Sequence, residues 1–230
     1  DHRDLHLSIR RQRQMCIRDR GAILSHKNLL SNTKVLEEYW KFTKDDVLLH
    51  MLPIYHTHGL FVATNLLAYV GGAMIFLPKF DIDQAIEWMS KATTMMGVPT
   101  FYTRLLSDQR FDQSLTNHMR LFISGSAPLL AETHREFEDR TGKKILERYG
   151  MTETNALGAN NAGEVYVKKP ASTGFGLPLL MELKIIDDDG NDLNTNETGE
   201  VCIKSASTFK GYWKNKEATD EALTKDGWVK

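Results

Sequence analysis

Short apolar runs alternate along most of this chain with longer segments of helical periodicity. The apolar runs lie at residues 47–51, 73–77, 93–96, 121–124 and 144–146. The helical segments lie at residues 25–39, 60–69, 81–90, from Pro99 onward, and 129–141. Continuous apolar runs are typical of strands buried on both faces, and parallel strands need helical crossovers between them. The alternation therefore predicts an α/β fold with a doubly wound, mostly parallel sheet.

The pattern changes after about residue 160. Residues 181–186 and 200–204 flank an Asp-Asp-Gly-Asn turn signal at 188–191, which predicts a strand, a turn and a second strand. A short helix is expected at 215–223. We therefore expect a nucleotide- and acyl-binding α/β part at residues 21–160, followed by a small β-rich, barrel-like subdomain of the same domain at residues 161–230.

The first 20 residues differ in composition from the rest of the chain. They contain six arginines and no lysine. A basic arm for nucleic acid is one interpretation, and a mitochondrial transit peptide, opposed by three aspartates, is another. The string QMCIRDR resembles translated sequencing-adapter read-through, which favours a non-native or disordered segment. Because the chain starts at Asp1 rather than Met, we interpret it as a fragment of a longer protein.

Charge and hydropathy exclude several classes of protein. A net charge of −1 gives no overall field to recruit nucleic acid or an anionic membrane. A hydrophobic content of 41% excludes a wholly disordered chain. Residues 59–77 are uncharged and approach the length of a membrane span, but Gly71–Gly72 and the polar Thr64 and Asn65 interrupt them. We expect a buried helix and a buried strand there, and no membrane or nucleic-acid partner.

Two loops that follow predicted strands carry candidate site residues. At residues 52–59, His56 and His58 could join His50 in a metal site, but no acidic or cysteine ligand lies nearby. A pocket-lining loop before a helix is the interpretation that we favour. At residues 124–128, Ser-Gly-Ser-Ala-Pro has small side chains that let the backbone approach a flat or anionic ligand, or simply form a tight turn.

A third expected loop, residues 147–154, combines an aromatic ring, a hydroxyl and a carboxylate. Tyr149 could stack on a base, and Thr152 could donate a hydrogen bond to a phosphate. Glu153 could hold Mg²⁺, which accepts one or two carboxylates and completes its shell with phosphates and water. A solvated turn is the alternative. All three loops are expected at the carboxyl edge of the sheet, where open α/β sheets bind ligands.

Four motifs together carry a family resemblance: PIYHTHG at 53–59, SGSAPL at 124–129, YGMTE at 149–153 and GEVCIKSASTFKGYW at 199–213. In this order and spacing they resemble the adenylate-forming acyl-CoA synthetases over residues 21–230. GVPTFYTRLL at 97–106 and LERYGMTET at 146–154 are most similar to the malonate-activating members. Such enzymes join a carboxylate to ATP, release pyrophosphate, and transfer the acyl group to coenzyme A.

The resemblance implies ATP, Mg²⁺ and coenzyme A as the cofactor and co-substrates, with a small acid, malonate, as substrate. It implies catalytic roles for His58, Thr152 and Glu153, with His58 beside the reacting carboxylate and Glu153 on Mg²⁺. The implied nucleotide-binding residues are Gly125, Ser126, Ala127, Tyr149, Gly150, Met151 and Thr152.

The second carboxylate of malonate needs a cationic partner, and arginine suits it best through its planar fork. Arg104 and Arg148 resemble the malonate-binding arginines of the family. The alternatives are a helix-face charge for Arg104 and, for Arg148, a surface ion pair with Glu147 or a neighbour.

The sequence departs from the family just before Gly21, where a Ser/Thr/Gly-rich phosphate loop ending in Pro-Lys-Gly is expected. The catalytic-lysine domain expected after residue 230 is also missing, so we expect this chain alone not to catalyse ligation. Two other hypotheses stay open: an adenylate-former for fatty, aryl or amino acids, and a catalytically inactive binding module. The compartment expected for the parent is the cytoplasm or the mitochondrial matrix.

Overall fold

The computed structural model describes residues 20–159, 175–176, 181–194 and 197–230. The expectations for residues 1–19, whether foreign segment, transit peptide or basic arm, lie outside the described residues.

Seven strands form one mixed sheet. They are β1 (Val47–His50), β2 (Ala73–Phe76), β3 (Thr94–Gly97), β4 (Leu121–Ser124), β5 (Ile145–Met151), β6 (Asn155–Ala159) and β7 (Phe175–Gly176). Their order is β2-β1-β3-β4-β5-β6-β7. Strands β1 to β5 are parallel, whereas β6 and β7 are added antiparallel. The predicted α/β class with a mostly parallel sheet is confirmed.

Helices connect the parallel strands. They are α2 (His26–Trp40), η1 (His58–Thr64), α3 (Asn65–Val70), α4 (Ile82–Met89), α5 (Pro99–Leu106), α6 (Gln113–Thr116) and α7 (Ala131–Thr141). Their ends follow local chemistry. The Ser25 and Asp81 side chains accept hydrogen bonds from the first turns of α2 and α4, and Gly142 ends α7 in the left-handed conformation.

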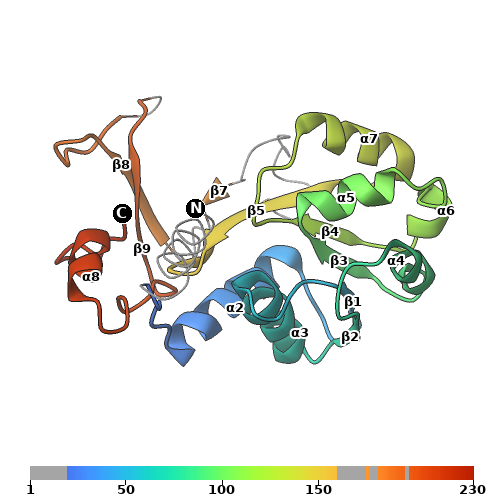
Figure 1. The fold of residues 1–230 in the computed structure, drawn as a ribbon, viewed down its shortest axis with the longest axis horizontal. Helices are drawn as coiled ribbons and strands as arrows, with labels where there is room; N and C mark the ends of the chain where they lie inside the picture. Colours follow the sequence, from blue (N-terminus) through green and yellow to red (C-terminus); the bar gives the residue numbers. More distant parts are fainter. Residues whose placement is uncertain (1–19, 160–174, 177–180, 195–196) are drawn as a thin grey trace, which may run out of the picture.

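Two hydrophobic cores cover opposite faces of the sheet. On one face, Leu48, Met96 and Ile123 pack with α2, η1 and α3. On the other face, their neighbours in sequence, including Met95 and Phe122, pack with α4, α5 and α7. Figure 1 shows the helices divided between the two faces in this way. Because adjacent strand residues point to opposite faces, the fully apolar runs in the sequence supply both cores at once.

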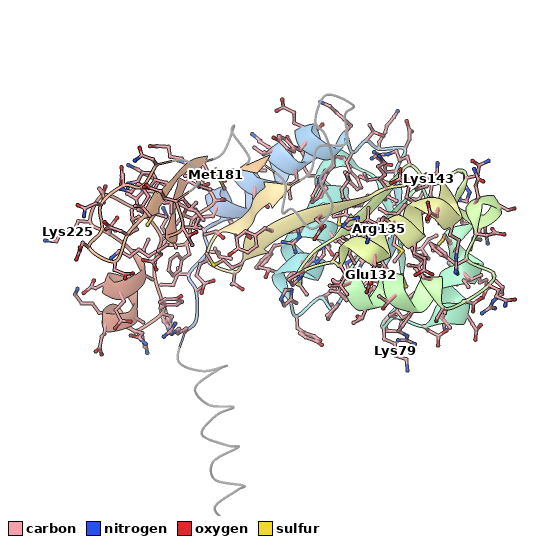
Figure 2. The ribbon with its side chains drawn as sticks, turned by 90° about the horizontal axis from the view of Figure 1, so that it is seen from above. Lys79, Glu132, Arg135, Lys143, Met181 and Lys225 are labelled. Carbon is pink, nitrogen blue, oxygen red and sulfur yellow. The ribbon has the colours of Figure 1, made fainter. Side chains whose placement is uncertain are left out.

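A smaller unit follows. Strands β8 (Met181–Ile186) and β9 (Glu200–Ser205) form an antiparallel pair. Helix α8 (Lys216–Ala222) follows, and its Ala218 packs with Phe209 and Tyr212. Figure 2 shows this unit, with Met181 and Lys225, at one end of the molecule, away from Lys79, Glu132 and Arg135. Ala22 and Leu24, at the start of the described chain, pack against Phe209 and Tyr212 of this unit. Strand β7 shows that the large sheet continues beyond residue 160.

Four local features differ from the sequence prediction. Strand β2, expected as a buried strand, lies at the edge of the sheet and is largely exposed. Residues 147–151, expected in a loop, continue β5, because antiparallel pairing with β6 extends that strand through Met151. The helix expected from residue 60 begins at His58 with π-type geometry. The single-turn α6, started by Asp112, was not predicted, since four residues show no helical periodicity. Among the described residues, none of the helices is long and apolar enough to cross a membrane.

Candidate functional site

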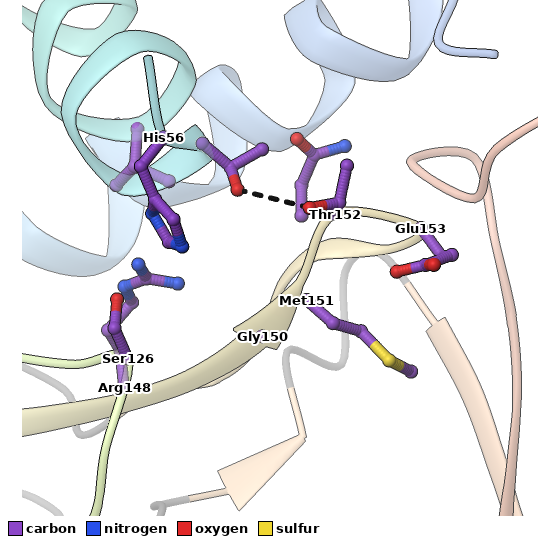
Figure 3. Close-up of a pocket in the computed structure, with 10 residues that line it drawn as sticks. His56, Ser126, Arg148, Gly150, Met151, Thr152 and Glu153 are labelled. Atoms are coloured by element: carbon purple, nitrogen blue, oxygen red, sulfur yellow. Dashed lines mark hydrogen bonds between the residues drawn. The ribbon is translucent and has the colours of Figure 1, made fainter. Parts of the chain in front are cut away.

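The strand order places a ligand-binding edge where the loops of β1, β4 and β5 meet. In the strand order β2-β1-β3-β4-β5, the direction in which the chain adds strands reverses between β1 and β3. Open α/β sheets bind ligands beside such a reversal, just outside the carboxyl ends of the strands. A pocket of about 270 Å³ lies at this edge (Figure 3). It is lined by His56, Thr57, Val62, Ser126, Arg148, Gly150, Met151, Thr152, Glu153 and Asn155.

The loop after β1 is folded back tightly before η1 begins. A Cβ at Gly59 would lie 2.3 Å from the Pro53 carbonyl oxygen, so only glycine fits this approach. His50 ties the loop together. Its Nδ1 accepts a hydrogen bond from the Leu52 N–H at 3.3 Å, and its Nε2 lies 3.1 Å from the Gly59 carbonyl oxygen. Both ring nitrogens of His50 are thus engaged with the backbone, which leaves no lone pair for a metal.

His58 lies behind the pocket wall and contacts Ser126. The His58 Nδ1 is 3.2 Å from the Ser126 Oγ, while its Nε2 is buried without a hydrogen-bond partner among the described residues. Burial, the Arg148 charge and two nearby histidines keep the pKa of His58 well below its usual value. The imidazole is therefore neutral at pH 7. Ser126 itself adopts a left-handed backbone conformation, with φ of +70°, that aims its hydroxyl at this ring.

Arg148 is the most unusual group of the site. Its side chain lines the pocket but is only 6% exposed, and its Nε has no hydrogen-bond partner. It forms no ion pair with any carboxylate among the described residues. Burial lowers the pKa of its guanidinium to about 10. Gly125 makes room for the side chain, since a Cβ there would lie 2.7 Å from the Arg148 Nε.

The alternative of a surface ion pair between Arg148 and Glu147 is wrong. Adjacent strand residues point to opposite faces, so Glu147 lies on the other side of β5. There its Oε1 lies 2.8 Å from the His134 Nε2, and its Oε2 accepts a hydrogen bond from the Leu129 N–H at 3.3 Å. These contacts fix the end of the Ser-Gly-Ser-Ala-Pro-Leu loop against α7. They leave the positive charge of Arg148 without this partner.

Thr152 and Glu153 lie beyond the end of β5. The Thr152 Oγ1 is 3.5 Å from the Thr57 Oγ1, across the pocket. The Glu153 Oε1 accepts a hydrogen bond from the Tyr212 hydroxyl at 2.7 Å, and burial together with this contact raises the pKa of Tyr212 to about 12. In Figure 3, Arg148 and Glu153 lie at opposite ends of the pocket, with Gly150 to Thr152 between them.

The donor set of the pocket can be tested against Mg²⁺. Glu153 is the only carboxylate among the lining residues, and no group of three or more potential ligands occurs in the part of the chain that the structure describes. Such a site does not form a protein cage for a metal. It fits Mg²⁺ held by one carboxylate and by substrate phosphates, which is the usual arrangement for this ion.

The structure brings most of the predicted site residues together. Ser126, Arg148, Gly150, Met151, Thr152 and Glu153 line the pocket, while His58 and Gly125 support it from behind. Ala127 and Tyr149 are exposed and do not line it. Arg104 also lies outside the lining: it is exposed on α5, with its guanidinium 4.6 Å from the Phe80 ring centre.

Four lining residues were not predicted to bind a ligand individually: His56, Thr57, Val62 and Asn155. His56 and Thr57 belong to the loop that was expected to line a pocket. Val62 and Asn155 gave no signal, because an apolar helix residue and an asparagine are common anywhere in a fold.

Comparison with known proteins gives one consistent result. The model of the family described as AMP-binding enzyme matches residues 18–213. A malonate–CoA ligase of Arabidopsis thaliana is 37% identical over 92% of this chain and 37% of its own length. A long-chain-fatty-acid–CoA ligase of Yersinia pestis is 32% identical over 91% of this chain and 38% of its own. The chain thus spans about two fifths of these relatives.

Among solved structures, ATP-bound MatB from Rhodopseudomonas palustris superposes with a TM-score of 0.88. It is 51% identical to this chain, over 91% of this chain and 41% of its own. The family match covers well over half of the residues, and the fold and the pocket at the carboxyl edge agree with it. The chain belongs to the AMP-binding enzyme family.

Proposed function

We propose that the protein activates malonate with ATP, forming an acyl-adenylate and pyrophosphate, and then transfers the acyl group to coenzyme A. The observation that carries the proposal is the buried guanidinium of Arg148, which lines the pocket without a carboxylate partner. The relatives named above are longer proteins, so ligation is proposed for the whole protein. Binding of the acid and the nucleotide is proposed for the residues of this chain.

Arg148 favours an acid with two negative charges. A buried cation without a partner is costly, and an anionic ligand offsets that cost through two parallel hydrogen bonds. Malonate can place one carboxylate at the guanidinium and leave the other for reaction with ATP. An aliphatic acid would bury the same charge against methylene groups, which disfavours it.

The neutral His58 supports the acid end of the pocket in this proposal. Its unpartnered Nε2 can donate one hydrogen bond toward a carboxylate when Nδ1 accepts from the Ser126 hydroxyl. A neutral imidazole adds no second positive charge beside Arg148. The reacting carboxylate therefore keeps its negative charge and its nucleophilic character while it is oriented.

The nucleotide is proposed to extend from the loop after β4, beside Arg148, to Glu153 at the other end of the pocket. We assign the adenine site to Gly125, Ser126 and Ala127 with Tyr149 packing on the base, and the α-phosphate to Thr152, beside Gly150 and Met151. Glu153 would hold Mg²⁺, which when bound neutralises charge on the ATP phosphates. Within this proposal the chain acts mainly by positioning and by charge neutralisation.

Arg104 is proposed as a second residue that binds the acid, although fewer observations favour it than favour Arg148. Its guanidinium is exposed and stacks on Phe80 rather than lining the pocket. Substituting each arginine in turn distinguishes their contributions to malonate binding. If Arg104→Met leaves malonate binding unchanged while Arg148→Met abolishes it, Arg148 alone recognises the second carboxylate.

Calorimetric titration of the chain with malonate and with hexanoate, each in the presence of ATP and Mg²⁺, tests the proposal. Malonate should bind at least tenfold more tightly, and Arg148→Met should remove the difference. Arg135→Met, which removes an exposed arginine from α7 (Figure 2), is the matched control and should bind malonate normally. Equal binding of both acids, or equal loss in both variants, refutes a dicarboxylate site. Preference for hexanoate would indicate activation of aliphatic acids.

A further inference from the structure

Two hydrogen bonds join the smaller unit to Glu153, just beyond the end of β5. The Tyr212 hydroxyl donates to the Glu153 Oε1 at 2.7 Å. The Phe209 N–H donates to the Glu153 backbone oxygen at 2.7 Å. Glu153 is therefore held through both its main chain and its side chain by residues more than fifty positions later in the sequence.

The ring of Tyr212 is itself fixed by its surroundings. It is 8% exposed and packs edge-to-face on Phe209, with the ring centres 4.9 Å apart. The Tyr212 N–H donates to the Thr219 Oγ1 at 2.8 Å. Gly211 has φ of +122°, and a Cβ there would lie 2.6 Å from the Thr219 Cγ2, so the backbone approaches α8 closely. The phenol thus reaches Glu153 from a rigid support.

The Tyr212 hydroxyl binds one oxygen of the Glu153 carboxylate and leaves the other oxygen available. Glu153 Oε1 accepts the Tyr212 hydrogen bond, whereas Oε2 has no hydrogen-bond partner among the described residues. A free glutamate side chain loses rotamer entropy when a ligand fixes it. A carboxylate already oriented by a hydrogen bond avoids most of that loss on binding a cation.

We propose that Tyr212 is a positioning residue that orients the Glu153 carboxylate, so that Oε2 is presented to the divalent cation of a bound metal–nucleotide complex. This inference rests on the proposed function, in which Glu153 binds that cation. It assigns a role in the nucleotide site to the smaller unit, through the segment Gly211-Tyr212-Trp213. Tyr212 acts only through Glu153 and does not itself touch the substrate.

The contact can be tested without any ligand by a double-mutant cycle on unfolding. Tyr212→Phe and Glu153→Ala, singly and combined, are compared by urea denaturation. A hydrogen bond to a charged group predicts a coupling of about tenfold in the unfolding equilibrium constant, which equals about 1.4 kcal/mol. Strictly additive effects of the two substitutions would show that the contact does not form, and would overturn the inference.

The role can be tested with Mn²⁺, which takes the same oxygen ligands as Mg²⁺ and is followed by its electron paramagnetic resonance signal. In the presence of ATP, Tyr212→Phe should weaken Mn²⁺ binding about five- to tenfold, and it should have no further effect when Glu153 is already alanine. Tyr102→Phe is the matched control, because it also loses a buried tyrosine hydrogen bond, to the Ile123 carbonyl oxygen, away from Glu153. It should leave Mn²⁺ binding unchanged.

The outcomes separate the two claims. If the unsubstituted chain binds no Mn²⁺ with ATP, the proposed function fails and the inference fails with it. If that chain binds Mn²⁺ and Tyr212→Phe binds it equally well, the inference alone is refuted. Equal weakening by Tyr102→Phe would also refute it, since the effect would then reflect lost stability.

Discussion

Replacing the buried Arg148 with methionine should stabilise the free chain while it weakens binding of a dicarboxylate. Methionine is shorter than arginine, but its unbranched apolar side chain adapts readily to an apolar cavity. Arg148 is 6% exposed, and its guanidinium has no carboxylate partner among the described residues, so the folded chain carries an uncompensated charge. Removing that charge removes its desolvation cost.

The magnitude follows from the pKa of the guanidinium. Burial lowers it from 12.5 to about 10, which corresponds to roughly 3 kcal/mol, since each factor of ten in proton affinity is worth about 1.4 kcal/mol. Below pH 10 the arginine is charged in both the folded and the unfolded chain, so the whole cost is present at pH 7. It disappears only as the pH rises from 10 to 12.5. Allowing for imperfect packing, Arg148→Met should raise the free energy of unfolding by about 1–3 kcal/mol.

Urea denaturation at pH 7 measures this change, and each kcal/mol should also raise the Tm by about 2–4 °C for a chain of this size. Arg148→Lys is the control for charge. It keeps a buried cation and should give no comparable stabilisation. Malonate at one hundred times its Kd should stabilise the unsubstituted chain by about 2.7 kcal/mol and the methionine variant hardly at all.

The reasoning is refuted if Arg148→Met unfolds at a lower urea concentration than the unsubstituted chain. That result would mean that the guanidinium is well paired in the free chain, because breaking a satisfied buried pair is destabilising. The site would then lack the unpaired charge on which dicarboxylate binding depends.

Three further predictions concern groups around the site and the sheet. Because the pKa of His58 is held well below its usual value, the unfolded chain binds a proton below pH 6.5 that the folded chain does not. The free energy of unfolding should therefore decrease as the pH is lowered. In urea titrations between pH 7 and 5, His58→Gln should reduce that slope by up to about 1.4 kcal/mol per pH unit, the full reduction being reached below about pH 6. An unchanged slope would show that the imidazole protonates freely. Asp46→Asn removes a carboxylate that accepts two hydrogen bonds of 2.7 Å from Arg120. The free energy of unfolding should decrease by about 2–4 kcal/mol, and a decrease below about 1 kcal/mol would contradict the pairing. Gly125→Ala places a Cβ against the Arg148 Nε. It should weaken malonate binding about tenfold and lower the free energy of unfolding by about 1 kcal/mol. Normal malonate binding in calorimetry would mean that the arginine has room to move.

The central parallel strands could be predicted because β1, β3 and β4 are buried on both faces, whereas the edge strand β2, expected to be buried, is largely exposed. Runs such as Leu48–Leu49 and Met95–Met96 send one residue to each core, which produces a continuous apolar signal. Helix ends were predictable where a single side chain makes the cap, as Ser25 and Asp81 do. These features depend on neighbours in the sequence, and the sequence shows them directly.

The extension of β5 could not be predicted in the same way. Residues 147–154 contain glycine, threonine and charged side chains, and this composition is typical of a loop. Their strand conformation depends on antiparallel pairing with β6 and on a register shift between Tyr149 and Gly150. The burial of Arg148 has a similar origin. It depends on the approach of Gly125 from the loop after β4, more than twenty residues earlier in the chain.

The register shift between Tyr149 and Gly150 lies where the pocket-lining segment begins. Gly150 and Met151 at the end of β5, and Thr152 and Glu153 in the turn that follows, line the pocket in succession. A regular strand would turn alternate side chains away, whereas an irregularity re-aims them. The same segment keeps its two charges apart. Arg148 is held beneath Gly125, and the Glu153 carboxylate is bound by Tyr212 of the smaller unit. If the two groups paired, each would satisfy the other and the pocket would attract neither an anion nor a cation. Their separation leaves the desolvation cost of Arg148 uncompensated in the free chain, and binding of an anionic ligand can then recover it.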